Sequence, residues 1–246
     1  LIFFHPHAPS PAAQESRGLG DVYKRQEKAQ AAINKVAEAL GFDYVLDSSA
    51  GGSVIMADGK DLIDLANPFA MALPNATFIS PDAPDPCAMS PQGRQWFPIE
   101  EIPNGAIRAS ESLIKLINKE AEDLNLTFKD VVLIGFSQGA MMSMQCLLLN
   151  KFQLGAIIGY SGALRDENIE AASFQLINGK HKFSDTPILL VHGEQDEVVP
   201  FHSLQKSKSL LDNIGFNVET LSRPKLGHGI DPEGISRGME MLKQIN

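Results

Sequence analysis

The sequence predicts an α/β fold in which helices cover both faces of a mostly parallel β-sheet. From Ala76 onward, short apolar runs of strand length alternate with longer segments of helical periodicity, which is the pattern of strands joined by crossover helices. One apolar run, 131–134, passes directly into a glycine-flanked turn and then into an apolar segment of helical length. At 246 residues the chain is long enough to bury one large core as a single domain.

The individual elements follow from length, periodicity and flanking residues. Strands are expected at 76–79, 131–134, 155–160, 187–193 and 216–221. Helices are expected at 103–124, 139–149, 201–213 and 232–245. The apolar side of the first of these helices is formed by Ile107, Leu113, Ile114 and Ile117. Segment 165–185 is polar, and we expect it to be irregular.

The turn after the strand at 131–134 places a serine in a special position. Gly135-Phe136-Ser137-Gln138-Gly139 has G-x-S-x-G spacing between a buried strand and a helix. A serine on such a sharp turn exposes its hydroxyl to a substrate, and the glycines remove side chains that would clash where strand and helix pass closely. The first amides of the helix, that of Gln138 included, point toward the space where an oxyanion would develop. The pentapeptide also occurs by chance, but its strand–turn–helix setting favours a nucleophile.

A serine hydroxyl needs a general base, and the base needs a carboxylate that fixes its tautomer. Asp196 follows the strand predicted at 187–193, and His228 follows the strand predicted at 216–221. The chain order Ser, Asp, His is the order found in hydrolases with a G-x-S-x-G turn. Glycines on both sides of His228 suit a loop that holds an imidazole at an unusual angle. The sequence therefore predicts Ser137, Asp196 and His228 as a catalytic triad.

The choice of the acid and of the base has rivals in the same sequence. Glu194 and Glu197 flank Asp196 and could each orient the base instead. Asp196 is preferred because Val198-Val199-Pro200 continues the loop directly after it.

The other histidines have structural interpretations. His192 closes a strand and is expected to be packed and hydrogen-bonded, His202 to begin a surface helix, and His181 to lie in a polar loop. None of the histidines shows metal-ligand spacing, so we expect no metal and no other cofactor.

These motifs resemble those of the phospholipase/carboxylesterase family of α/β-hydrolases, which includes bacterial carboxylesterases and acyl-protein thioesterases. The resemblance rests on Gly-Phe-Ser-Gln-Gly, on 192–200 and 227–229, and on 80–84 and 93–97, and it runs from about Asp58 to the end of the chain. It implies an α/β-hydrolase fold and a serine carboxylesterase that acts through an acyl-enzyme. The implied substrates are short- to medium-chain carboxylic esters, lysophospholipids or thioesters.

The segment that should supply the second oxyanion donor departs from the family pattern. Family members carry a His-Gly-x-Gly turn just before an Ala-Asp-Gly-x-Asp-Leu motif. The second motif is present at 57–62, but Ser53-Val54-Ile55-Met56 stands where the turn should be. The amide of Ile55 is the candidate replacement. Because loss of one oxyanion donor costs about a hundred- to a thousand-fold in rate, the alternative is a catalytically impaired scaffold that acts as a binding protein.

The first part of the chain resembles a different family. Residues 27–40 have the periodicity of an amphipathic helix, and 44–56 read as a hairpin. Together they resemble the C-terminal end of the OmpH/Skp periplasmic chaperone family. We therefore predict an atypical, foreign segment at 1–57, formed by a chimeric join, and a hydrolase domain at 58–246 that lacks the first strands of its sheet.

Three side chains are predicted to bind the substrate. Met89 and Trp96 lie in the loop after the strand at 76–79, and Met141 lies in the helix after the nucleophile. Methionine and aromatic side chains are typical of adaptable apolar clefts. Phe136 and Met144 are expected in the core instead.

Charge and composition argue against several classes of binding partner. The net charge of −9 and the pI near 5.1 argue against nucleic acid, whose phosphates would be repelled. No apolar run reaches the ~18 residues of a spanning helix, so stable membrane insertion is not expected. Two cysteines, Cys87 and Cys146, do not form a disulfide framework, and a cytoplasmic location is predicted. The expected partner is a small-molecule ester, and a homodimer remains an open alternative.

Overall fold

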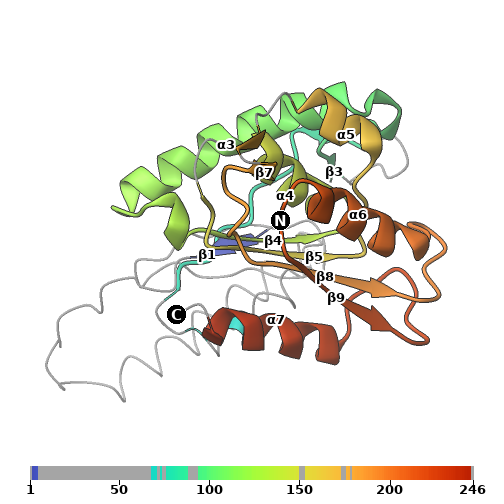
Figure 1. Ribbon diagram of the computed structural model, residues 1–246. Coiled ribbons are helices and arrows are strands. Elements are labelled where there is room, and N and C mark those ends of the chain that lie inside the picture. Colours follow the sequence, from blue (N-terminus) through green and yellow to red (C-terminus); the bar gives the residue numbers. More distant parts are fainter. Residues whose placement is uncertain are drawn as a thin grey trace, which may run out of the picture.

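The structure is a computed structural model of the chain, and it describes residues 2–4, 68–70, 73, 76–87, 94–149, 153–172, 176–177 and 179–244. Its centre is a five-stranded sheet in the order β1-β4-β5-β8-β9 (Figure 1). The strands are β1 (Ile2–Phe4), β4 (Val132–Phe136), β5 (Ala156–Tyr160), β8 (Ile188–Gly193) and β9 (Val218–Arg223). The last four are parallel to one another, which confirms the predicted mostly parallel α/β sheet.

The parallel strands form because their apolar runs are buried on both faces. All five residues of β5 and all six of β8 are buried, as expected of strands covered by helices on both sides. The register places Ile157 opposite Leu133 and Ile188, so β-branched and leucine side chains stack across the centre of the sheet.

The strand at the edge beside β4 comes from the start of the chain. β1 pairs with β4 in the antiparallel direction, with Ile2 opposite Ile134 and Phe4 opposite Val132. This neighbour was not among the predicted strands. The predicted helix at 27–40, the hairpin at 44–56 and the motif at 57–62 lie outside the described residues.

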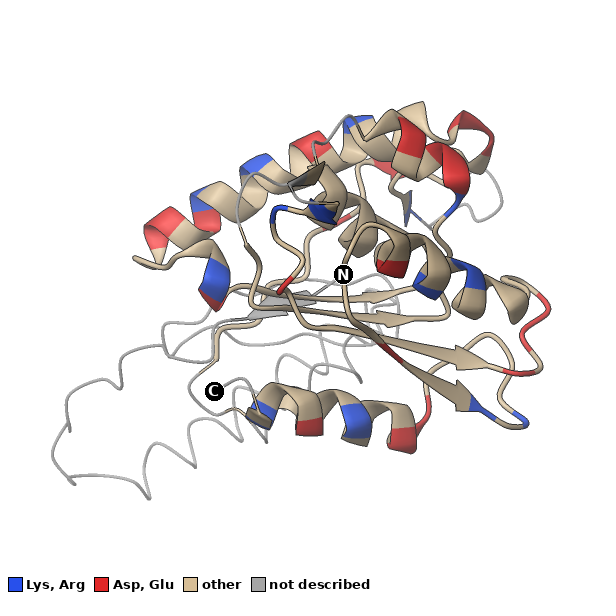
Figure 2. Cartoon of the chain, in the orientation of Figure 1, with Lys and Arg blue, Asp and Glu red and all other residues tan. Residues whose placement is uncertain are grey.

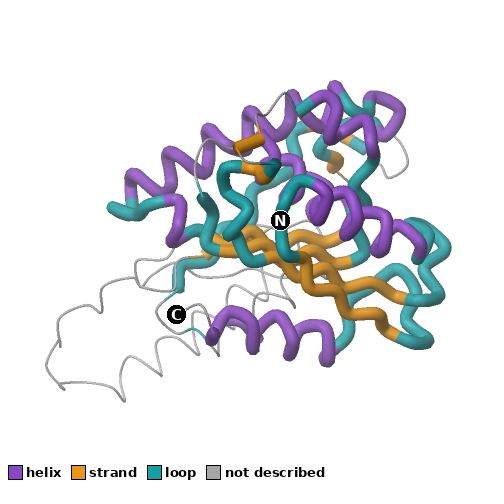
Figure 3. The backbone as a smooth tube through the Cα atoms, viewed as in Figure 1, coloured by secondary structure: helices purple, strands orange, loops and turns teal. Residues whose placement is uncertain are grey.

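Helices lie on both faces of the sheet (Figures 1 and 3). One face carries α3 (Asn104–Asp123), α4 (Gln138–Leu149) and α6 (His202–Asn213), and the other carries α7 (Pro232–Gln244). Each of these four helices begins and ends within a residue of its predicted bounds, because apolar periodicity marks α3, α6 and α7 and a continuous apolar run marks the buried helix α4. Among the described residues, no helix combines the length and apolar character needed to cross a bilayer.

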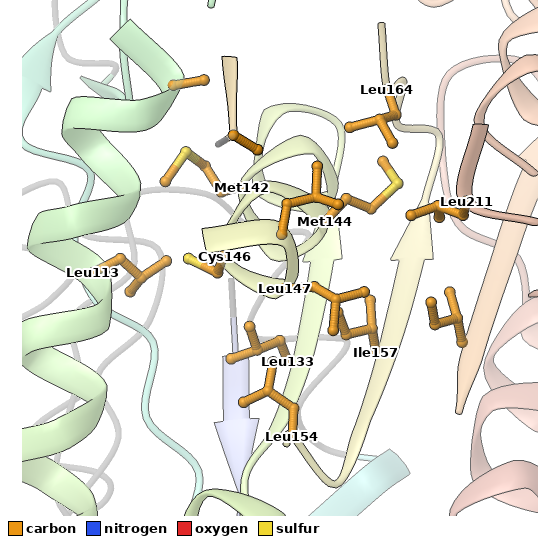
Figure 4. Close-up of a cluster of buried hydrophobic side chains, with 14 of the residues drawn as sticks. Leu113, Leu133, Met142, Met144, Cys146, Leu147, Leu154, Ile157, Leu164 and Leu211 are labelled. Atoms are coloured by element: carbon orange, nitrogen blue, oxygen red, sulfur yellow. The ribbon is translucent and has the colours of Figure 1, made fainter. Parts of the chain in front are cut away.

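Alternate side chains of the strands supply two cores. On the α3–α4–α6 face, Leu113, Leu133, Leu147 and Ile157 are completely or almost completely buried together (Figure 4). On the α7 face, the core contains Phe69, Tyr160, Met241 and neighbouring strand residues. Charged residues lie mainly on the helices and connecting turns, while the strands in the centre carry few (Figure 2). Both cores keep the sheet rigid where its strands end at the site described below.

Two regions differ from prediction. The strand expected at 76–79 is reduced to a single bridge residue, Ile79. Segment 165–185 is more regular than expected, because it contains the helix α5 (Asp166–Ala171) and a hairpin of β6 (Leu176–Ile177) and β7 (Lys180–His181). Asn168 caps α5 by accepting a hydrogen bond from the Arg165 amide, and its own amide donates to Gln145 of α4. These polar residues therefore hold α5 against α4.

His181 is the clearest correction in that segment. His181 is only 4% exposed, and its ring stacks on the Phe216 ring at a centroid distance of 5.1 Å. Burial lowers the pKa of the His181 imidazole. The histidine is thus a packed aromatic side chain and not part of a polar loop.

The remaining short elements lie in the segments that lead into α3 and β4. A two-stranded ribbon joins β2 (Asp85–Pro86) to β3 (Arg94–Gln95). Two 3-10 turns, η1 (Ile99–Glu101) and η2 (Phe128–Asp130), precede α3 and β4 respectively.

Candidate active site

Ser137 occupies a sharp turn between β4 and α4. Its φ of 51° lies in the left-handed region that residues with side chains rarely adopt. The Ser137 amide donates to the Tyr160 carbonyl at 2.8 Å, so the sheet continues to hold the backbone at the turn. A Cβ at Gly135 would lie 2.3 Å from the Gly139 carbonyl oxygen, which explains why the strand and helix can pass only with glycine there. Strained backbone at a strand end is a common property of functional sites.

The structure brings the three predicted triad side chains together from three strand ends. His228 Nε2 lies 3.0 Å from Ser137 Oγ, and His228 Nδ1 lies 2.9 Å from Asp196 Oδ2. Both distances are hydrogen-bonding distances. Since the carboxylate only accepts, Nδ1 carries the proton, and Nε2 is free to accept the serine proton. The imidazole is therefore in the tautomer that a general base requires.

Asp196 is held from both sides. Its Oδ1 accepts the amide hydrogens of Val198 at 2.9 Å and Val199 at 2.8 Å, and its side chain is 0% exposed. Burial opposes the charge, but the hydrogen bonds from His228, Val199 and Val198 outweigh it and lower the pKa of the Asp196 carboxyl. Glu194 and Glu197, the rival acids, are exposed. The loop that follows Asp196 is thus what makes it the buried acid.

The loop that carries His228 is fixed by neighbours on other strands. Ser161 Oγ donates to the Gly229 carbonyl at 3.3 Å, and the Phe136 ring lies 4.8 Å from the imidazole centroid. The imidazole is 18% exposed, so it faces the rim of the site.

The glycine that this loop needs is not one of the two predicted from the sequence. Neither Gly227 nor Gly229 has a positive φ, and a Cβ at Gly227 would make only an ordinary 3.6 Å contact. A Cβ at Gly193 would instead lie 2.3 Å from the Gly227 carbonyl oxygen. Close packing at Gly193, and not a special backbone conformation at Gly227 or Gly229, is therefore what requires a glycine here.

Gln138 contributes to the site in two ways. As the first residue of α4 it presents its amide at the helix N-terminus beside Ser137. Its side chain spans the gap to the loop after β3, where Oε1 accepts the Trp96 amide at 2.7 Å and Nε2 donates to the Phe97 carbonyl at 2.8 Å. The side-chain role was missed by sequence reasoning, since nothing in the spacing of residues some 40 positions apart indicates a contact.

The predicted substrate-binding residues differ in burial, and one of them is not described by the structure. Trp96 is buried beside the Gln138 side chain, and Met141 is half-buried on the first turn of α4. Met89 and the second oxyanion candidate, Ile55, lie outside the described residues. Among the residues that the structure describes, no three histidine, cysteine, aspartate or glutamate side chains gather as a metal site.

The family model described as phospholipase/carboxylesterase matches residues 57–246. The chain belongs to this family. It is 31% identical over 165 residues to a probable carboxylesterase of Oryza sativa subsp. japonica, which covers 63% of this chain and 60% of the rice protein. It is 28% identical over 210 residues to acyl-protein thioesterase 1 of Yarrowia lipolytica, which covers 80% of this chain and 87% of that relative.

Solved structures agree with the fold. The crystal structure of esterase PE8 superimposes with a TM-score of 0.66 at 31% identity, and the match covers 77% of this chain and 88% of the esterase. The chain thus has the α/β-hydrolase fold, with its four parallel strands and helices on both sides of the sheet. Its relatives are carboxylesterases and thioesterases.

Proposed function

We propose that this chain is a serine carboxylesterase that hydrolyses short- to medium-chain carboxylic esters through an acyl-enzyme. The observation that carries the proposal is the continuous hydrogen-bonded path from Ser137 Oγ through His228 to Asp196. Family membership supports the same reaction class. The name of the thioesterase relatives adds thioesters to the substrates that should be tested.

The proposed reaction uses each side chain for one task. His228 Nε2 accepts the Ser137 proton while Oγ attacks the carbonyl carbon, and the oxyanion faces the Gln138 amide. The carbon–oxygen bond to the alcohol then breaks, and His228 returns its proton to the leaving alcohol. Water attacks the acyl carbon in the second half, gives its proton to His228, and releases the acid as the proton returns to Oγ. Asp196 keeps its hydrogen bond to Nδ1 throughout and stabilises the imidazolium.

Replacement of the nucleophile is the direct test. In Ser137→Ala, hydrolysis of a short p-nitrophenyl ester should fall by roughly 10⁴-fold or more, because removal of one triad member leaves only residual catalysis. A fluorophosphonate probe should label the wild-type protein at Ser137, identified by peptide mass spectrometry. Ser112→Ala, which removes an exposed serine hydroxyl of α3, is the matched control. It should hydrolyse the ester and be labelled at Ser137 as the wild type is.

The same probe separates the enzyme from the alternative, a catalytically impaired scaffold that acts as a binding protein. That alternative is favoured because the sequence has no His-Gly-x-Gly turn before 57–62. Folded wild-type protein that is not labelled at Ser137 would support the scaffold and contradict the esterase. If Ser137 is labelled, the ratio of ester to thioester turnover over a series of acyl lengths assigns the substrate class.

A further inference from the structure

The acid of the proposed triad has a second imidazole beside it. His192 is the fifth of the six residues of β8, and its side chain is 1% exposed. Its Nε2 lies 2.9 Å from the Val199 carbonyl oxygen and 3.3 Å from Asp196 Oδ2. The ring therefore touches both the carboxylate and the loop that surrounds it.

The two contacts determine where the His192 proton lies. A carbonyl oxygen and an ionised carboxylate oxygen can only accept hydrogen bonds. Nε2 must therefore carry a hydrogen, which it donates to the Val199 carbonyl, while Asp196 Oδ2 lies 3.3 Å from the same nitrogen. The Phe201 ring packs against the edge of the imidazole at 6.2 Å between centroids and contributes no polar group.

His192 thereby contacts one oxygen of the acid and holds the loop that binds the other. Oδ2 lies between two imidazoles, with His228 Nδ1 at 2.9 Å and His192 Nε2 at 3.3 Å. Oδ1 accepts hydrogen bonds from the amides of Val198 and Val199. His192 donates a hydrogen bond to the carbonyl of the same Val199. Because the Asp196 side chain is fully buried, water has no access to replace a donor that is removed.

We propose that His192 is a positioning residue that fixes Asp196, and through it the orientation and tautomer of His228. It does not touch the reacting atoms, so its effect should appear in the rate of acylation and not in substrate affinity. The inference rests on the proposed serine hydrolase function.

A matched set of variants isolates the hydrogen-bond donor. His192→Gln keeps an N–H near the position of Nε2, whereas His192→Leu and His192→Phe remove it while retaining apolar volume. Leu189→Ala, at a fully buried position of the same strand on the face of the second core, controls for loss of packing alone. Each variant is compared with wild type by thermal unfolding, by kcat and KM for a p-nitrophenyl ester, and by the rate of fluorophosphonate labelling.

The expected pattern depends on the donor and not on stability. His192→Leu and His192→Phe should lower kcat and the labelling rate about 10- to 100-fold, the range for leaving a buried hydrogen-bonding group without its partner, with KM little changed. His192→Gln should recover most of that loss. Leu189→Ala should unfold at lower temperature but label at close to the wild-type rate. Folded Leu or Phe variants that label as fast as wild type, or a Gln variant no better than Phe, would overturn the proposal.

A spectroscopic measurement on the wild-type protein keeps the test independent of folding of the variants. Nitrogen-15 and proton spectra of histidine-labelled protein should show a hydrogen on Nε2 of His192 and a low-field His228 Nδ1–H resonance. A hydrogen on Nδ1 of His192 instead would contradict the inference. If Ser137 is not labelled even in folded wild type, the proposed function itself fails, and that result is distinct from equal labelling of all His192 variants.

Discussion

At the scale of single residues, burial and not sequence position distinguishes the proposed acid from its neighbours. Glu194, Asp196 and Glu197 lie within four positions of one another, and the sequence favoured Asp196 with the two glutamates as rivals. In the structure the two glutamates are exposed, while Asp196 turns inward onto His228 and two loop amides. The turn formed after Asp196 decides this, because its amides satisfy a carboxylate that would otherwise be too costly to bury.

Exchange of the acid tests that distinction. Asp196→Asn should lower kcat by about 10⁴-fold, because an amide at this position can stabilise the wrong tautomer of the base. Glu194→Gln and Glu197→Gln are matched neutralisations of exposed neighbours, and each should remain within about twofold of wild type. Steady-state kinetics on a p-nitrophenyl ester compares the three variants. A large loss in either glutamine variant and none in Asp196→Asn would reassign the acid.

At the scale of elements, the nucleophile turn is linked by hydrogen bonds to the loop that follows β3. The Gln138 side chain links the first turn of α4 to the main chain of Trp96 and Phe97 with one accepted and one donated hydrogen bond. Strand–turn–helix order made the turn predictable from the sequence. The link was not, because it depends on the three-dimensional approach of two segments that share no local pattern. For the same reason the glycine that the His228 loop requires is found at Gly193 on β8, in a different element.

Loss of the link should be visible in fluorescence. Trp96 is the single tryptophan of the chain, so its emission reports on this loop alone. Gln138→Ala should shift the emission to longer wavelength and increase quenching by acrylamide, since the loop of Trp96 and Phe97 loses both hydrogen bonds to Gln138. If Trp96 binds the acyl chain as predicted, KM for medium-chain esters should also rise several-fold. Gln205→Ala, an exposed position on α6, should leave the emission unchanged. Identical spectra for Gln138→Ala and wild type would show that the loop is held by packing instead.

At the scale of the whole molecule, two hydrophobic cores lie on opposite faces of one sheet and bury its central strands. Because apolar strands and helices alternate along the sequence, this layered arrangement could be predicted from Ala76 onward. The strand Ile2–Phe4 beside β4 and the β6–β7 hairpin were not predicted, because two- and three-residue strands are too short to show a periodicity. The domain division at residue 57 and the chimeric origin of the first segment stay predictions.

The cysteines give a test of the packed core. Cys146 is 1% exposed on α4, and burial raises the pKa of its thiol to about 12, whereas Cys87 is half-buried in a loop. A disulfide-exchange reagent at neutral pH should therefore modify one thiol per native chain and both in denaturant, because the thiolate is the reactive form. Cys87→Ser should abolish the native reaction. Rapid modification of both thiols in the native protein would contradict the packing of α4 against α3.

The distribution of the site along the chain has a consequence for how such an enzyme can diversify. The proposed proton path runs entirely between residues 137 and 228, and the four parallel strands that hold it lie between 132 and 223. Trp96, by contrast, belongs to a loop that precedes α3 and touches this half through the Gln138 side chain. We expect exchanges in the loop of Trp96 to alter which acyl group is accepted without moving Ser137, Asp196 or His228. Selectivity and proton transfer would then evolve in separate segments of one polypeptide.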